Sequence, residues 1–314
     1  MSTAQNNSEK RLGVIDIGSN SIRMMLFEWG ADGFQNVEKF LRTTRLGKGV
    51  DASGRLSEAS ISRSFEALAE LTAIAKKEGV AEVYAFATSA MRDAKNADAL
   101  TGPAKEKLGL DIDIVDGDTE AKYGFCGVST CFSGPVVIAD IGGGSTEIIC
   151  GSQSQGIVWD KSLNVGAVRE TDKYVNSDPP SPDAVAQIEG EVREQVQALL
   201  TAHGKPSGAV LAGIGGTITT LSSIAQHLEV YEPEKIHMSR LTYKTVCGIQ
   251  EDLCRKTNAG RRQIVGMDPK RADIIVAGTT ILKAVMAALN QPPVTVCGHD
   301  NLEGSAVCHY GFSK

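Results

Sequence analysis

One eight-residue phrase occurs twice in this chain, and the repeat limits how the chain can fold. The copies are Asp16-Ile-Gly-Ser-Asn-Ser-Ile-Arg23 and Asp140-Ile-Gly-Gly-Gly-Ser-Thr-Glu147. A short apolar run precedes each copy and another follows it, a pattern typical of two strands joined by a tight glycine turn. The sequence therefore predicts a duplicated β-hairpin, with an aspartate at the end of the first strand of each copy.

The tips of both predicted hairpins are small, polar and rich in hydrogen-bond donors. Backbone N–H groups in such tips point outward and form nests that bind anions. Hairpins commonly need glycine for the turn itself, so it is the duplication that favours a shared ligand. The residues expected to approach phosphate are Ser19, Asn20 and Ser21 in the first tip, and Gly143, Gly144, Ser145 and Thr146 in the second.

Three carboxylates accompany the two tips. Asp16 and Asp140 end the first strands, and a tight turn would bring Glu147 close to Asp140 on the returning strand. A strand-end aspartate is commonly a turn former, but two in the same setting favour a common ligand. Because Mg²⁺ needs only one or two carboxylates plus water and substrate phosphates, these three residues predict a magnesium site.

A third glycine-rich segment, Gly213-Ile-Gly-Gly-Thr217, lies between an expected strand and an expected helix. A helix N-terminus favours phosphate, so Gly215, Gly216 and Thr217 are candidate phosphate ligands, and a tight strand-to-helix turn is the alternative. The chain contains no GxxxxGK[ST] phosphate loop.

Two charged residues follow expected strands in the first half of the chain. Arg92 is either a surface charge or a phosphate ligand that donates two parallel hydrogen bonds. Glu120 lies in the first turn of a helix whose N-cap we expect to be Asp118. On position alone, Glu120 is a solvated carboxylate stabilised by the helix dipole.

The order of strands and helices is also repeated. Residues 12–47 indicate three strands, followed by a helix between Leu56 and Ala75 and by strands near 83–87 and 112–115. The second half has strands near 135–141, 145–151, 156–163, 209–211 and 294–297, with a long helical region over about 240–290. We expect an α/β protein of two domains, 1–125 and 126–314, hinged around residues 116–134. The cleft between them would hold both hairpins, and the last helix is expected to pack back on the first domain.

Composition excludes several classes of protein. The net charge of −6 argues against generic binding of nucleic acid, and the chain has no run of 18 apolar residues that could span a membrane. Seven cysteines form no CxxC pair, and five histidines show no spacing typical of metal ligands. We therefore expect reduced, mostly buried thiols in a cytoplasmic protein. The sequence does not define the oligomeric state, and a homodimer is the assembly that we consider.

Taken together, the motifs resemble those of the exopolyphosphatase/guanosine pentaphosphate phosphatase (Ppx/GppA) family, and they span the chain from Val14 to about Gly304. The resemblance implies two duplicated ribonuclease-H-like (actin-like ATPase) domains, each a mixed five-stranded sheet flanked by helices. The motifs are the two hairpins, Arg45-Leu-Gly-Lys-Gly-Val50, Ala87-Thr-Ser-Ala-Met-Arg92, Gly117-Asp-Thr-Glu-Ala121 and Gly213-Ile-Gly-Gly-Thr-Ile-Thr-Thr-Leu221.

The resemblance also implies an activity, the Mg²⁺-dependent release of terminal phosphate from inorganic polyphosphate. By position, Glu120 matches the general base and Arg92 a phosphate-binding arginine. Asp140 and Glu147 match metal-linked carboxylates, and Asp16 belongs to the first phosphate loop. One departure is Leu302, which stands where family members often carry arginine in Gly-Leu-Arg-Glu-Gly.

Three other functions use the same features. A guanosine pentaphosphate 5′-phosphatase would need a pocket for the base. A kinase or ATPase would bind adenosine at Gly213 to Thr217 and would form ADP. A non-hydrolytic nucleotide or alarmone sensor would bind its ligand with Mg²⁺ and release no phosphate. The basic pairs Arg255-Lys256, Arg261-Arg262 and Lys270-Arg271 either line a polyanion path or are solvated helix faces.

Overall fold

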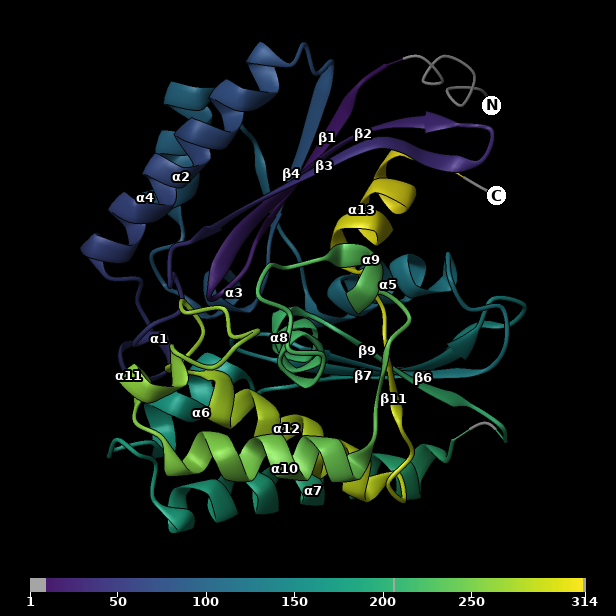
Figure 1. Cartoon of the computed structure of the whole chain (residues 1–314). Coiled ribbons are helices and arrows are strands. Elements are labelled where there is room, and N and C mark those ends of the chain that lie inside the picture. Colours follow the sequence, from purple (N-terminus) through teal and green to yellow (C-terminus); the bar gives the residue numbers. More distant parts are fainter. Residues whose placement is uncertain (1–9, 206, 313–314) are drawn as a thin grey trace. The chain divides into compact units, whose positions relative to one another are not determined.

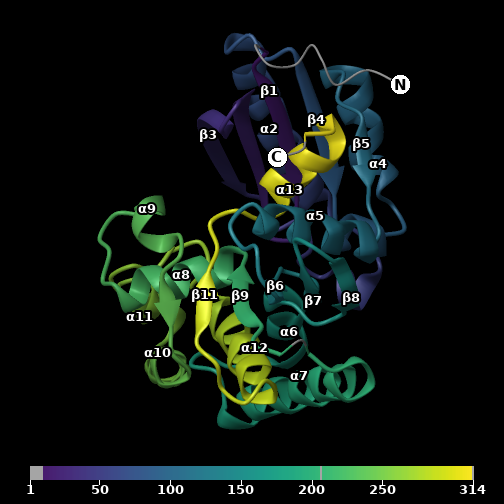
Figure 2. The ribbon, with the colours of Figure 1, turned by 90° about the vertical axis from the view of Figure 1, so that its right-hand side faces the viewer.

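The computed structural model describes residues 10–205 and 207–312, which divide into two compact units. The first unit comprises residues up to Gly127 together with those from Asn301 onward, and the second comprises Val128–Asp300. Figures 1 and 2 show the elements of both units. No helix among the described residues is long and apolar enough to cross a membrane.

The first unit contains a mixed sheet of five strands in the order β3-β2-β1-β4-β5. Strands β1 and β2 are antiparallel, whereas β1, β4 and β5 run parallel. The strands are β1 (Leu12–Ile17), β2 (Ser21–Gly30), β3 (Gly33–Thr43), β4 (Glu82–Ala87) and β5 (Ile112–Ile114). The helices are α1 (Val50–Ser53), α2 (Glu58–Lys77), α3 (Ser89–Asp93), α4 (Asp98–Pro103), the π-helical turn η1 (Ala104–Leu108), α5 (Gly117–Ser129) and α13 (Asn301–Tyr310).

Helices cover both faces of this sheet, with α13 and α2 on opposite sides (Figure 2). Successive side chains of β1 point to opposite faces, so Ile15 packs in the cluster that contains Leu68 of α2, and Val14 in the cluster that contains Leu302 of α13. Helix α2 begins where the hydroxyl of Ser57 caps a backbone N–H. Burial on both faces explains why β1 is apolar throughout apart from Asp16 and Gly13.

The second unit repeats the sheet order and adds one strand. Its order is β8-β7-β6-β9-β11-β10. The sheet therefore has six strands where we expected five, and the additional strand is β10, a short strand at its edge. Its strands are β6 (Val136–Ile141), β7 (Thr146–Ser152), β8 (Gly156–Leu163), β9 (Val210–Ile214), β10 (Arg240–Leu241) and β11 (Val294–Val296). Its helices are α6 (Ala167–Tyr174), α7 (Pro182–His203), α8 (Gly216–Ala225), α9 (Pro233–Ile236), α10 (Tyr243–Arg255), α11 (Asn258–Arg261) and α12 (Ile275–Ala288).

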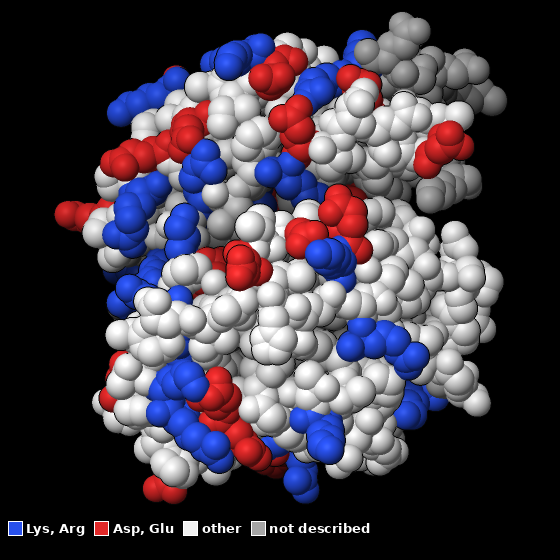
Figure 3. Space-filling view, viewed as in Figure 1, with Lys and Arg blue, Asp and Glu red and all other residues white. Residues whose placement is uncertain are grey.

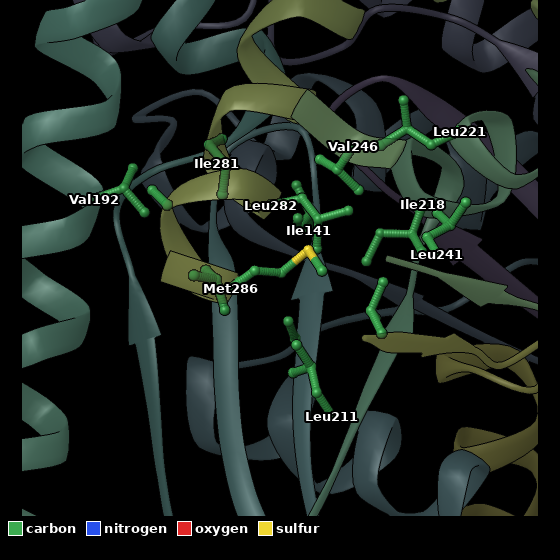
Figure 4. Packing of buried hydrophobic residues seen from close by; sticks show 14 of the residues in the cluster. Ile141, Val192, Leu211, Ile218, Leu221, Leu241, Val246, Ile281, Leu282 and Met286 are labelled. Carbon is green, nitrogen blue, oxygen red and sulfur yellow. The ribbon is translucent and has the colours of Figure 1, made fainter. Parts of the chain in front are cut away.

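The core of the second unit lies between its sheet and α12. Figure 4 shows Ile281, Leu282 and Met286 of α12 beside Ile141 of β6, and all four are buried. Helix α12 in turn packs against α7, α8 and α10. The core therefore anchors β6, the strand that ends at the second hairpin.

The helical region expected over 240–290 is interrupted, so that prediction was wrong in its extent. Gly266 adopts a positive φ of 86°, and a Cβ there would lie 2.4 Å from the carbonyl oxygen of Ser223. Pro269 follows and cannot donate a helical hydrogen bond. Residues 262–274 therefore form a connection between α11 and α12.

Candidate functional site

The first hairpin joins β1 to β2 and carries an ion pair. Asp16 lies directly opposite Arg23 in the strand register. Asp16 is buried, and Arg23 Nε donates to its Oδ2 at 3.1 Å while a second guanidinium nitrogen contacts the same oxygen. Arg23 therefore compensates the charge of this aspartate. We identified no role for Arg23 from the sequence, although its place opposite Asp16 in a tight hairpin is a signal that could have indicated the pair.

The carbonyl groups at the first tip are held from behind by the loop that follows β3. Asn20 O accepts from the backbone N–H groups of Thr44 (3.1 Å) and Arg45 (2.9 Å), and Ser19 O accepts from Gly47 at 2.8 Å. In a trans peptide the C=O and N–H point in opposite directions. The N–H groups of Asn20 and Ser21 therefore point away from this loop, which is the arrangement of an anion-binding nest.

The same tip is linked to the predicted base through α3. Ser19 Oγ lies 2.9 Å from Ser89 Oγ at the start of α3. Arg92, in the same helix, donates from Nη1 to Glu120 Oε2 at 3.1 Å and to Val115 O at 3.0 Å. Glu120 is buried, with only 5% of its surface exposed, so it differs from the solvated carboxylate expected from position alone. The first unit thus brings Ser19, Arg92 and Glu120 into one hydrogen-bonded region.

Helix α5, which carries Glu120, begins differently from our expectation. The residue that caps it is Asp116, whose Oδ1 accepts from Thr119 N at 2.8 Å, and the prediction of Asp118 was wrong. Because the capped N–H must be two or three residues after the cap, a helix that starts at Gly117 selects Asp116. Hydrogen bonds from Thr119 lower the pKa of the Asp116 carboxyl below its usual value.

The second hairpin joins β6 to β7 and carries two carboxylates. Asp140 lies opposite Glu147 in the strand register, as predicted, and both are buried. Ser162 of β8 donates from Oγ to Glu147 Oε1 at 2.7 Å. Two buried oxygen ligands on facing strands are chemically suited to Mg²⁺.

The carbonyl groups of the second tip are held by the N-terminus of α6. Gly142 O accepts from Ala167 N at 2.9 Å, and Gly143 O accepts from Val168 N at 2.7 Å. Arg169 Nε donates to Gly144 O at 2.7 Å. By the same peptide geometry, the N–H groups that follow these carbonyls, those of Gly143, Gly144 and Ser145, point away from α6. The hydroxyl of Thr146 donates to Val165 O at 2.7 Å, so it serves the fold of this unit.

The third glycine segment lies beside the second hairpin. Gly215 has a φ of 92°, and a Cβ there would lie 3.0 Å from Asp140 Oδ1, so only glycine fits this approach without strain. The guanidinium of Arg271 lies over Gly216 at the first turn of α8, and its Nε is 3.4 Å from Asp268 Oδ2. The second unit therefore brings Asp140, Glu147 and the Gly215–Thr217 loop together and adds Arg271. That residue was predicted only as part of a basic pair.

Most of the other basic pairs are engaged locally. Arg255 and Lys256 form ion pairs with Glu251 and Asp252 on α10, where Lys/Arg and Asp/Glu side chains alternate on the surface (Figure 3). Arg261 is buried and pairs with Asp178 at 2.8 Å. These contacts favour a structural role for Arg255, Lys256 and Arg261 over a polyanion path.

Leu302, the departure from the family motif, is a core residue of the first unit. Only 2% of its surface is exposed, and it packs with Leu12 and Tyr123 among others. The next residue, Glu303, is buried and forms an ion pair with Lys39 at 2.5 Å. The position therefore contributes apolar packing in this chain.

The cysteines and histidines also differ from our expectation. Only Cys150 and Cys297 are buried, and the other five thiols are partly exposed. The ligand atoms of Cys131, His237 and Cys297 lie within 4.8 Å of one another, although their spacing in the sequence gives no metal-ligand pattern.

Comparisons with known proteins agree with the family resemblance seen in the sequence. The Ppx/GppA phosphatase family model matches residues 25–308. Exopolyphosphatase 2 of Mycobacterium tuberculosis is 32% identical over 313 residues, covering 95% of this chain and 98% of that protein. Among solved structures, an exopolyphosphatase from Cytophaga hutchinsonii has a TM-score of 0.88 at 26% identity, covering 97% of this chain and 99% of its own. An Aquifex aeolicus Ppx/GppA family member has a TM-score of 0.80 at 28% identity, with 97% and 99% coverage.

Proposed function

Because the chain belongs to the Ppx/GppA phosphatase family, we propose that it is a Mg²⁺-dependent exopolyphosphatase that releases the terminal phosphate of inorganic polyphosphate. The observation that carries this proposal is the duplicated hairpin. In both units the tip carbonyls are bonded from behind, and the N–H groups of the tip point away from those bonds. Each hairpin would then bind phosphate through its own backbone N–H groups.

The two units contribute different charges. Asp140 and Glu147 would hold Mg²⁺, which would neutralise charge on the substrate oxygens. Asp16 was predicted as a third metal-linked carboxylate, and its pairing with Arg23 makes it the least suited of the three. Arg271, close to Gly216, adds a positive charge at the third loop and would bind a further phosphate oxygen.

Glu120 would act as the general base. Its contact with Arg92 fixes the position of the carboxylate, which would orient a water for in-line attack and accept its proton. Arg92 would also offset charge on the transferred phosphoryl group. Phosphoryl transfer depends mainly on positioning and charge stabilisation, and these residues supply both.

The proposal is tested by phosphate release with Glu120→Gln. Loss of a general base should lower turnover by about 10²–10⁴-fold and leave substrate affinity nearly unchanged. Glu106→Gln, on an exposed turn of the same unit, is the control and should retain full turnover. If Glu120→Gln retained turnover within about tenfold, a change of ~1.4 kcal/mol in barrier, the assignment of the base would fail.

The substrate is decided by a parallel assay. Phosphate release from polyphosphates of defined length should exceed release from guanosine pentaphosphate, and both should require Mg²⁺. Faster release from guanosine pentaphosphate would favour the alternative 5′-phosphatase activity. Binding of either ligand without release of phosphate would favour a regulatory protein instead.

A further inference from the structure

A cluster of sulfur and nitrogen ligands lies in the second unit, formed by residues that are far apart in the sequence. Cys131 comes two residues after the end of α5, His237 directly after α9, and Cys297 directly after β11. Each offers one ligand atom, and these three atoms lie within 4.8 Å of one another. His299, two residues after Cys297, places its Nδ1 3.5 Å from Cys131 Sγ.

The distance from Cys131 to each of the two histidines is close to an edge of a tetrahedral metal site. With metal–sulfur bonds of about 2.3 Å and metal–nitrogen bonds of about 2.0–2.1 Å, a tetrahedron has sulfur–nitrogen edges of about 3.6 Å. The Cys131 Sγ lies 3.9 Å from His237 Nε2 and 3.5 Å from His299 Nδ1. The imidazole rings of the two histidines are also close, with centroids 5.3 Å apart.

We propose that Cys131, His237 and Cys297 bind a zinc ion. His299 lies beside Cys131 but outside the group of ligand atoms that are all within 4.8 Å of one another, so it would become the fourth ligand by moving closer to the other two residues. Two cysteines and two histidines are a ligand set of structural zinc sites, and thiolates favour zinc over magnesium. This site is chemically distinct from the oxygen ligands of Asp140 and Glu147, which suit a hard cation.

The cluster combines one buried thiol with two ligands that are partly exposed. Cys297 is only 1% exposed, whereas Cys131 and His237 are partly exposed. A metal ion can therefore enter from the side of Cys131 and His237 and reach a thiol that is shielded from water.

Two hydrogen bonds must be exchanged when the metal binds. Gly298 N donates to His237 Nδ1 at 2.9 Å, whereas ligation through Nε2 places the proton on Nδ1. Thr130 Oγ1 lies 2.7 Å from His299 Nδ1 and must release that nitrogen. The loss of two ordinary hydrogen bonds is small beside the free energy that a structural zinc site contributes to folding.

The position of the cluster in the chain suggests what the metal would stabilise. The chain leaves the first unit after Gly127 and returns to it after Asp300. Cys131 follows the first of these crossings, and Cys297 and His299 precede the second. Zinc would thus fasten both crossing segments to the residue that follows α9, and its removal should lower the melting temperature of the protein.

The test is titration of Co²⁺, as a spectroscopic probe for zinc, into the untagged full chain purified under reducing conditions. We expect one equivalent to bind with a thiolate-to-cobalt absorption band and the visible bands of tetrahedral cobalt. Zn²⁺ should displace the cobalt and raise the melting temperature. Cys131→Ser and Cys297→Ser should each weaken cobalt binding by roughly 100-fold or more. This exceeds the loss of affinity that usually follows when only a residue hydrogen-bonded to a ligand is replaced.

Two variants serve as controls for this titration. Cys254→Ser alters a partly exposed thiol outside the cluster, and Asp140→Asn alters the proposed magnesium site. Both should leave the cobalt spectrum unchanged. The proposal is overturned if the wild-type chain shows no thiolate–cobalt band or if that band survives Cys131→Ser. It is also overturned if Cys131 and Cys297 form a disulfide in protein purified under reducing conditions. The wild-type titration decides the matter even if a cysteine variant does not fold.

Discussion

The two hairpins have the same backbone arrangement but differ in the charge of their side chains. In both, an aspartate ends the first strand and the tip carbonyls are bonded by the segment that follows the third strand. The residue opposite the aspartate is Arg23 in the first hairpin and Glu147 in the second. Duplication therefore preserved the backbone of the hairpin, while the residue opposite the aspartate is a cation in the first hairpin and a second carboxylate in the second.

The facing of two carboxylates in the second hairpin has an energetic consequence. Like charges directly opposite on neighbouring strands are destabilising, whereas opposite charges stabilise the pair. Asp140 and Glu147 are both buried, so a divalent cation between them and the substrate would offset their repulsion. We infer that the second hairpin is the metal-dependent one, and that the first hairpin binds phosphate directly.

The largest predicted effect separates the two aspartates. Asp140→Asn should lower turnover by about 10²–10³-fold and raise the Mg²⁺ concentration needed for half-maximal rate, because it removes a proposed metal ligand. Asp16→Asn should leave that Mg²⁺ concentration unchanged, since Arg23 remains. Phosphate release measured against Mg²⁺ concentration distinguishes the two. An equal shift in both variants would remove the difference between the hairpins.

The first hairpin depends on a support from the end of the chain. Helix α13 packs on β1 and β2, and it crosses α5 so closely that a Cβ on Gly304 would lie 1.7 Å from Tyr123 O. Gly304→Ala should therefore cost about 3 kcal/mol of unfolding free energy by overpacking. Denaturant unfolding measures this, and Gly102→Ala, with nothing within 4 Å of its Cβ, is the matched control. Equal stability of both variants would contradict the packing.

The second hairpin depends instead on Gly215. Gly215→Ala adds a side chain at positive φ beside Asp140, and should cost about 1–3 kcal/mol of stability and weaken Mg²⁺ activation. Gly47→Ala, which would crowd Ser19 in the first hairpin, should leave Mg²⁺ activation unchanged. The same melting and Mg²⁺ titrations check both. Weaker Mg²⁺ activation in Gly47→Ala would show that the hairpins are not independent.

The smallest predicted effect concerns Asp116, which caps the N-terminus of α5, the helix that carries Glu120 in the first unit. The pKa of Asp116 is lowered in the folded protein, so its carboxylate stabilises the folded state at any pH above the usual pKa of aspartate. This stabilisation is lost as the pH falls through the pKa that Asp116 has in the folded protein. Asp116→Ala should cost about 0.5–1 kcal/mol near neutral pH, and less in acid. Thermal unfolding at pH 7 and pH 3 tests this. A cost that grows in acid would be inconsistent with the cap.

Sequence reasoning predicted what depends on local pattern. The alternation of apolar residues predicted the succession of strands along the chain apart from β10, and a tight turn was enough to place Glu147 beside Asp140. It failed where contacts join distant segments. Arg271 lies over Gly216 and belongs to a connection that we had predicted to be helical. The Cys131, His237 and Cys297 cluster forms only once three separate elements are folded, so no spacing could reveal it.

The division of roles between the hairpins is tested most directly by a crystal structure of Glu120→Gln with Mn²⁺ and tripolyphosphate. The anomalous signal of manganese locates the metal without reference to activity. We predict a peak within coordination distance of Asp140 and Glu147, with phosphate oxygens on the backbone N–H groups of Gly143 and Gly144. A peak on Asp16, with none on Asp140, would contradict the account.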